Sequence, residues 1–335
     1  MLFEDAHWAD PSTLDMIDMA LARLHDRRAL VVMTFRPEFQ APWTGQAGVT
    51  LIALSRLESA DSAQLAAQIT LDQVLPPALL ARIVAQADGV PLFIEELTRA
   101  VLESGASAAT ALGVPETLQA SLMARLDRLP LAKQAAQIGS VIGREFSHAL
   151  IRSIAGMPES VLAEGLDQLV ASGLVFRRGE PPDATYLFKH ALVQDASYDT
   201  LLRTRRAALH SAIAAGLERD PEVAATQPAL LGHHYAEAGQ PAQAARFLVR
   251  AGEQAAARSA MVEARAHLDR GLAVAGEIRD ETERRLRMAE LMLALGNVQM
   301  ATHGYGSHEH GAAFAEAARF CRGLDLEDDR HGACR

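Results

Sequence analysis

The first residues of the chain carry two adjacent acids directly after a short apolar stretch. Leu2 and Phe3 predict the end of a strand, and Glu4 and Asp5 follow at its tip. A carboxylate at a rigid strand end can hold Mg²⁺ through water, because this ion keeps several waters and needs few carboxylates. The adjacent acid can orient or deprotonate an attacking water. The alternative interpretation is an Asx-type cap after the strand, with both acids merely solvated.

The elements that would position these acids follow a strand–helix–strand order. Asp10 and Pro11 predict a helix start, since Asp caps well and Pro suits the first turn. Residues 29–34 form a continuous apolar run, which is typical of a strand buried on both faces of a parallel sheet. Residues 50–54 predict a third short strand. The start of the chain is therefore predicted to be of the βαβ type.

Beyond residue 60 the pattern is mainly helical. Residues 61–104 predict helices with a break at residues 88–91, and residues 105–113 predict a linker of small residues. Short helices then lead to two apolar runs around a Gly/Pro turn, which predict a β-hairpin at residues 174–178 and 185–188. Helices followed by such a two-stranded wing suggest a winged-helix domain.

From residue 227 the chain is helical and rich in alanine. The segments HHYAEAGQPAQAARFLVRAGEQA and SAMVEARAHLDRGLAVAGEI share the small-residue spacing of helix-turn-helix repeats. Their period is about 20 residues, shorter than the 34 of a tetratricopeptide repeat (TPR). We interpret this part as an irregular α-solenoid, with a plain helical bundle as the alternative.

Composition and charge limit the partners. The net charge of −10 argues against an overall nucleic-acid-binding surface. The helix that would enter DNA in a winged-helix domain, residues 159–172, carries three acids and neither Arg nor Lys. We therefore expect no direct contact with nucleic acid. No apolar run reaches the ~18 residues of a membrane helix, and no signal-peptide pattern is present, so the expected location is the cytoplasm, without membrane contact.

Five segments occur in an order that resembles the signal-transduction ATPases with numerous domains, the STAND class of AAA-like ATPases. They are LFEDAHWADPSTLDMI, VVMTFRPEF, ADGVPLFIEELTRAVLE, VPETLQASLMARLDRLP and FKHALVQDASYDTLL. They look most like the regions found behind class III adenylate/guanylate cyclase domains in bacteria. Similar regions occur in LuxR-type and SARP-type transcriptional regulators. The resemblance covers residues 2–275 and implies a nucleotide-binding module that uses ATP or ADP with Mg²⁺.

The resemblance implies roles for particular residues. Glu4 and Asp5 match the paired Walker B acids, which are catalytic and hold Mg²⁺ through water. Arg36 matches the sensor arginine that reads the γ-phosphate; alternatively it is a loop arginine paired with the acid two positions later. Pro91 matches the proline that lies against adenine, and it also suits the first position of a helix. His190 matches the histidine that contacts the β-phosphate of ADP; alternatively it is an ordinary histidine at a helix start.

Other histidines receive structural interpretations. His7 and Trp8 match the HWAD motif of the family, and we assign them packing beside the site. His303, His308 and His310 lie in a glycine-rich stretch without ordered spacing on one helix face. A solvated turn between helices is the preferred interpretation there, and a metal site is the alternative.

One required motif of the class is missing. STAND ATPases need G-x-x-x-x-G-K-[ST], whose backbone amides cradle the phosphates and whose lysine neutralises them. The chain has no such motif, and its two lysines, Lys133 and Lys189, follow no glycine-rich loop. The P-loop strand and helix would precede residue 1. We therefore expect an N-terminally truncated region that alone neither binds ATP tightly nor hydrolyses it, with unpaired strand edges.

The predicted fold is an α/β partial P-loop NTPase sheet followed by a mostly α part with a winged helix and an irregular TPR-like α-solenoid. The predicted domains are 1–105 (C-terminal part of the ATPase domain with its helical lid), 114–202 (winged-helix-like), 203–323 (helical repeats) and 324–335 (polar tail).

The leading functional hypothesis is an ATP/ADP-dependent regulatory switch of a multidomain signal-transduction protein, associated with an adenylate/guanylate cyclase. In the parent protein the nucleotide would sit between the α/β domain and the winged helix, and the ATP state could assemble into oligomers. The alternatives are the ATPase and repeat region of a LuxR-type regulator, or an interaction scaffold with a vestigial ATPase. In the switch hypothesis and in the scaffold hypothesis, the helical repeats bind a protein partner. A third possibility is a fragment without a function of its own.

Overall fold

The computed structural model describes residues 1–24, 27–70, 75–104, 117–305 and 307–322. The predicted linker at 105–113 and polar tail at 324–335 lie outside the described residues. The described chain is mostly helical and divides into two compact units, each treated by itself below. Unit 1 is Met1–Ile52 with Leu217–Arg335, and unit 2 is Ala53–Gly216. Among the described residues, no helix combines the length and apolar character that a membrane crossing requires.

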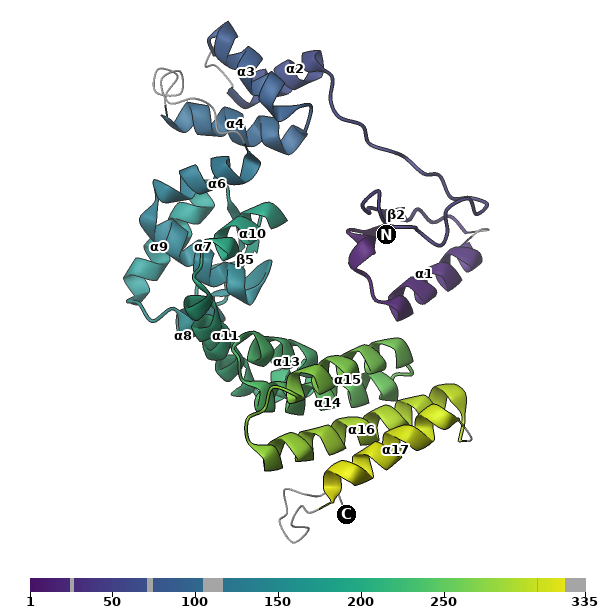
Figure 1. Cartoon of the computed structure of the whole chain (residues 1–335). Coiled ribbons are helices and arrows are strands. Elements are labelled where there is room, and N and C mark those ends of the chain that lie inside the picture. Colours follow the sequence, from purple (N-terminus) through teal and green to yellow (C-terminus); the bar gives the residue numbers. More distant parts are fainter. Residues whose placement is uncertain (25–26, 71–74, 105–116, 306, 323–335) are drawn as a thin grey trace. The chain divides into compact units, whose positions relative to one another are not determined.

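The first 52 residues, called the N-terminal segment below, have the predicted strand–helix–strand order (Figure 1). The elements are β1 (Leu2–Phe3), the 3₁₀ helix η1 (Ala6–Trp8), α1 (Pro11–Leu24) and β2 (Val32–Met33). The two strands pair in parallel, with Phe3 opposite Met33. Both side chains pack against the buried residues Ile17 and Trp43, so one face of the strand pair is covered.

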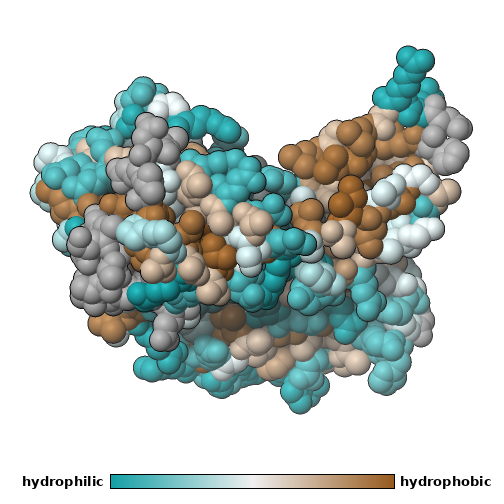
Figure 2. Space-filling view, turned by 90° about the horizontal axis from the view of Figure 1, so that it is seen from above, coloured by the Kyte–Doolittle hydropathy of each residue, from teal (hydrophilic) through white to brown (hydrophobic). Residues whose placement is uncertain are grey.

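The other strand predictions for this segment fail in part. The strand predicted at residues 29–34 is shorter and is not buried on both faces, since only Val32–Met33 pairs and Leu30 is 75% exposed. The strand predicted at residues 50–54 is wrong: these residues form no strand, and Leu54 is 94% exposed. A strand needs partners for its backbone groups, and among the described residues none pairs with 50–54. Figure 2 shows apolar residues, in brown, gathered at the surface on the right of its view.

Unit 2 begins with three helices that surround one small core. They are α2 (Ser59–Thr70), α3 (Pro77–Ala87) and α4 (Pro91–Ser104), with the predicted break between the last two. Leu79, Ile83, Ile94 and Leu97 lie at the centre of this core. The break depends on Gly89, which has φ +69°, and a Cβ there would lie 2.4 Å from the carbonyl oxygen of Leu57. This turn therefore sets the start of α4.

The rest of unit 2 combines helices with a small sheet. The elements are α6 (Leu118–Asp127), α7 (Pro130–Ile142), β3 (Glu145–Ser147), α8 (His148–Ile154), α9 (Glu159–Ala171), β4 (Val175–Arg178), β5 (Thr185–Phe188), α10 (Ala191–Asp199) and α11 (Arg203–Glu218). β4 and β5 form the predicted hairpin, and β3 completes an antiparallel sheet of order β3–β5–β4. Phe146 of β3 stacks on Tyr186 of β5 with ring centroids 5.5 Å apart.

The helices from residue 221 on pack in chain order, as the green-to-yellow ribbon of Figure 1 shows. They are α12 (Pro221–Thr226), α13 (Pro228–Glu237), α14 (Pro241–Ala257), α15 (Met261–Ala275), α16 (Glu281–His303) and α17 (His308–Cys321). From α13 to α16, each helix presents a glycine to a large side chain of the next helix. A Cβ on Gly232, Gly252, Gly271 or Gly296 would lie 2.9, 2.6, 2.4 or 2.4 Å from Leu248, Leu268, Leu291 or Phe314, respectively. This close stacking is consistent with the predicted helical solenoid.

Candidate functional site

Glu4 and Asp5 lie at the carboxyl end of β1, as predicted, and both are exposed. Asp5 adopts the left-handed conformation, with φ 56° and ψ 44°, and its side chain makes no capping hydrogen bond to η1. The backbone N–H of Asp5 donates to Thr34 Oγ1 at 3.0 Å, and the N–H of Ala6 donates to the carbonyl of Thr34 at 2.8 Å. The residue after β2 therefore fixes the turn that carries the two acids, and the Asx-type cap is not formed.

Arg36 follows β2 and lies at the same edge of the strand pair as the acids, because parallel strands bring their carboxyl ends together. Its guanidinium lies 6.0 Å from the ring centroid of Trp8, a distance at which a cation is attracted to the face of an indole. Trp8 is itself exposed. In the part of the chain that the structure describes, no ion pair joins Arg36 to Glu38, so the alternative interpretation of this arginine gains no support.

His7 packs against Trp8, with ring centroids 5.2 Å apart. Both ring nitrogens of His7 are buried and make no hydrogen bond within the described structure. The HWAD residues thus pack beside the acids of the N-terminal segment. No described residue forms a hydrogen bond that would orient the His7 ring, and such an orienting bond is expected for a general base.

The two remaining predicted residues, Pro91 and His190, belong to unit 2. Pro91 is the first residue of α4, in agreement with its interpretation as a helix-start proline. Its side chain is exposed, so a ligand can also contact it. His190 is the N-cap of α10, although its side chain makes no capping hydrogen bond. Its Nε2 atom is buried and has no hydrogen-bond partner among the described residues.

The surroundings of His190 favour the neutral imidazole. Burial lowers its pKa from 6.5, the positive charges of Lys189 and Arg144 lower it further, and the carboxylate of Glu95 opposes them. A neutral imidazole with an unpartnered Nε2 can donate one hydrogen bond to an incoming acceptor if that nitrogen carries the proton. The position suits an anionic oxygen better than a cation, because two positive groups are nearby.

The adjacent glutamates Glu95 and Glu96 of α4 each form an ion pair with a residue elsewhere in unit 2. These two ion pairs were not predicted from the sequence. Glu95 accepts a hydrogen bond from Lys189, which precedes His190. Glu96 pairs with Arg125 of α6, whose Nη2 also donates to the carbonyl of Ser172 at 2.8 Å. The available signals were the acid pair in FIEEL and the lysine in FKH, but their partners lie far away in the sequence.

The acids at the end of β1 have the chemistry that Mg²⁺ accepts, since one or two carboxylates with water suffice for this ion. A fuller protein cage is absent: within the described residues, no three His, Cys, Asp or Glu side chains form a metal-binding group. His303 ends α16 and His308 begins α17, so these two histidines flank a turn between helices, as predicted. His310 does not lie in a solvated turn: it is inside α17, where its Nδ1 lies 3.2 Å from the carbonyl oxygen of Gly296 and its ring packs on Phe314.

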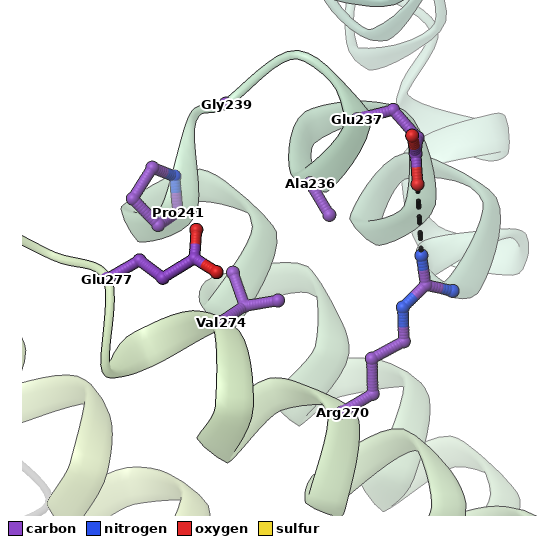
Figure 3. Close-up of a pocket in the computed structure, with 7 residues that line it drawn as sticks. All are labelled: Ala236, Glu237, Gly239, Pro241, Arg270, Val274 and Glu277. Atoms are coloured by element: carbon purple, nitrogen blue, oxygen red, sulfur yellow. Dashed lines mark ion pairs between the residues drawn. The ribbon is translucent and has the colours of Figure 1, made fainter.

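The helical repeats carry a separate small pocket of about 260 Å³ (Figure 3), lined by Ala236, Glu237, Gly239, Pro241, Arg270, Val274 and Glu277. Arg270 lies 3.9 Å from Glu237 and donates to His233 Nδ1 at 3.1 Å. Burial and then the charge of Arg270 lower the pKa of His233. Figure 3 shows Glu277 on the opposite side of the pocket. Such a polar notch on a stack of helices can receive a protruding side chain of a partner.

No protein-family model matches the chain. An uncharacterized protein of Rhizobium meliloti (strain 1021) is 29% identical over 341 residues, covering 95% of this chain and 32% of that protein. The chain thus spans about a third of the length of that relative. A solved Signal Transduction ATPase with Numerous Domains (STAND) protein with a tetratricopeptide repeat sensor, from Pyrococcus horikoshii, matches with a TM-score of 0.43 and 12% identity, covering 96% of this chain and 62% of that one.

Proposed function

We propose that this chain is a nucleotide-responsive regulatory module of a multidomain signalling protein, associated with an adenylate/guanylate cyclase. One observation carries the proposal: β1 and β2 pair in parallel and present Glu4, Asp5 and Arg36 at one edge. This is the arrangement that a Walker B strand and its sensor strand need. We interpret the β3–β5–β4 sheet with its helices as a winged-helix domain of the same module.

The residues of the chain would divide the work. Bound Mg²⁺ supplies positive charge to the phosphates of ATP or ADP. Glu4 and Asp5 would hold the water shell of that ion, and their exposure leaves room for it. Arg36 would donate to a terminal phosphate oxygen, because a guanidinium matches phosphate geometry. Within unit 2, taken by itself, Pro91 is proposed as an adenine contact and His190 as a phosphate contact.

The chain lacks a G-x-x-x-x-G-K-[ST] motif, so the module alone has no backbone cradle for the phosphates. We therefore propose that it binds ADP weakly and releases no phosphate from ATP. Isothermal titration of the full chain with Mg·ADP and Mg·ATP tests this. Dissociation constants above the micromolar range are expected. Asp5→Asn should weaken binding only when Mg²⁺ is present, because asparagine tolerates the left-handed backbone but carries no charge.

The outcomes separate the hypotheses. Micromolar ATP affinity would contradict the importance of the missing motif, and no binding at millimolar ADP would contradict the switch. Translating the reading frame upstream of the Met1 codon is the complementary test. A P-loop motif there would support the switch in the parent protein, and a cyclase domain further upstream would support the cyclase association. A LuxR-type output domain would support the alternative assignment.

A second candidate is a protein-interaction scaffold. The stacked helices α13 to α17 and the pocket around Arg270 favour it, because such stacks offer extended binding surfaces. Both candidates include a protein partner at the repeats. In the switch, nucleotide would change the affinity for the protein partner, and in the scaffold it would not. Only the switch predicts that ATP causes the protein to form oligomers. Sedimentation of the parent protein with and without ATP would measure that difference.

A further inference from the structure

The ion pair of Glu95 and Lys189 joins two helix starts within unit 2. Glu95 lies one turn after Pro91 in α4, and Lys189 lies between β5 and α10. The same carboxylate oxygen, Glu95 Oε1, lies 3.2 Å from Arg99 Nη2 and 3.3 Å from Arg99 Nε. The side chains of Lys189 and Glu95 are 21% and 24% exposed, so solvent and solutes reach the pair from one side.

Positive groups predominate around this carboxylate. The N–H of Phe188 donates to the carbonyl of Arg144 at 2.9 Å, which brings Arg144 beside the end of β5. His190 follows Lys189 directly and has the buried, unpartnered Nε2 atom described above. Partial burial alone would raise the pKa of Glu95, but the hydrogen bond and charge of Lys189, with the charge of Arg99, hold it below its ordinary value. Glu95 is therefore the anion that Lys189 and Arg99 hold in this structure.

We propose that Glu95 is an internal competitor for a phosphoryl group, which takes its place on the Lys189 ammonium. The inference rests on the proposed nucleotide-dependent function and adds the means by which nucleotide is sensed. The exchange replaces one anion by another on the same cation, so the lysine is never left unpaired. Glu95 is released from Lys189, and among the described residues α4 keeps the ionic link of Glu96 to Arg125.

The neighbouring pair shows why the exchange is selective. Glu96 and Arg125 are each 2% exposed, so no solute reaches them. The Glu95–Lys189 pair is partly exposed, so a solute can reach it and compete for the lysine, whereas a fully buried pair resists the removal of either partner. A phosphoryl group would therefore change the Glu95 link and leave the Glu96 link in place.

Acetylation of Lys189 tests the proposal, and Lys133, the other lysine of the chain, is the internal control. Lys133 pairs with Asp127 at the surface. The full chain is treated with an amine-acetylating reagent with and without millimolar ADP or pyrophosphate, and peptide mass spectrometry follows both lysines. We expect either ligand to slow acetylation of Lys189 and not of Lys133. Pyrophosphate alone would reveal an anion site, and stronger protection by ADP would identify the nucleotide as its source.

A matched pair of variants tests the competition itself. Glu95→Gln removes the competitor, so ADP should bind about twofold to fivefold more tightly, a range set by the modest strength of exposed ion pairs. Glu164→Gln makes the same change at an exposed position of α9 in the same unit and should leave affinity unchanged. Circular dichroism confirms that both variants fold, and Glu95→Asp, which retains the carboxylate, should bind like the original chain.

Each result decides something. ADP binding with unprotected Lys189 and unchanged affinity in Glu95→Gln would overturn the competition while the proposed function stands. No binding of ADP or pyrophosphate to either protein would overturn both. Protection by pyrophosphate without any preference for ADP would support the exchange at Lys189 and count against the nucleotide function.

Discussion

Arg125→Met is expected to destabilise unit 2 strongly. The substitution leaves the Glu96 carboxylate buried without its partner and the Ser172 carbonyl without its donor. Breaking a buried ion pair costs about 3–5 kcal/mol, because the remaining charge is uncompensated. Burial already raises the pKa of Glu96, against the charge of Arg125, so losing this arginine raises the pKa further and the residue can escape part of the cost by taking up a proton.

The double variant Glu96→Met with Arg125→Met separates the charge from the packing. Apolar side chains of similar length can replace a buried ion pair at little net cost. The Ser172 carbonyl would still lack a donor, so a loss of about 1–3 kcal/mol should remain. Arg152→Met is the matched control in the same unit. Its pair with Glu159 is 53% and 59% exposed, so only a small change is expected.

The assay must report on unit 2. Both tryptophans, Trp8 and Trp43, lie in the N-terminal segment, so tryptophan fluorescence does not follow unit 2. Amide hydrogen exchange of peptides from α4 and α6 measures the opening free energy there directly. A double variant at least as unstable as Arg125→Met, or a single variant that differs little from the control, would refute the reasoning that an isolated buried charge dominates the cost.

Gly271→Ala should destabilise the repeats by about 1–3 kcal/mol through overpacking, because its Cβ would lie 2.4 Å from Leu291. Gly311→Ala in α17 meets no neighbour within 4 Å and should stabilise by up to about 1 kcal/mol; circular dichroism during urea unfolding measures both. Asp5→Ala should cost on the order of 1 kcal/mol or less, because alanine tolerates the left-handed backbone less well than aspartate, and Asp5→Gly should not; tryptophan fluorescence of the N-terminal segment measures both. Because the pKa of His190 is lowered below 6.5, the stability of unit 2 should fall as pH drops below that value; His190→Gln should remove this dependence, as hydrogen exchange at several pH values would show.

Local signals in the sequence predicted much of the fold. The hairpin follows from two short apolar runs around a Gly/Pro turn, and the break before α4 follows from Asp88-Gly89. The small residues of the repeats were informative for a physical reason that the structure shows: each glycine admits a large side chain of the next helix. Turns and helix breaks are set by adjacent residues, and the helix contacts of the repeats recur at similar small residues, so both can be predicted from the sequence.

Long-range pairing explains most of what was missed. The strand β3 has three residues and one buried side chain, Phe146, which is too short for an alternation to show. Residues 50–54 have the composition of a strand, yet no described strand pairs with them, and composition alone does not show whether a strand has a partner. The acids at β1 and the arginine after β2 were placed at the right edge, since the parallel order fixes that edge. The Glu95–Lys189 contact joins residues 94 positions apart, which no local pattern encodes.

The two glutamates of α4 show how a switch and a scaffold differ in physical terms. A scaffold needs contacts that persist, and Glu96 with Arg125 is such a contact, since both side chains are closed to solvent. A switch also needs a contact that a ligand can take over, and Glu95 with Lys189 qualifies because it is partly open and has further positive groups beside it. One closed link and one partly open link on adjacent residues are what the proposed exchange at Lys189 requires.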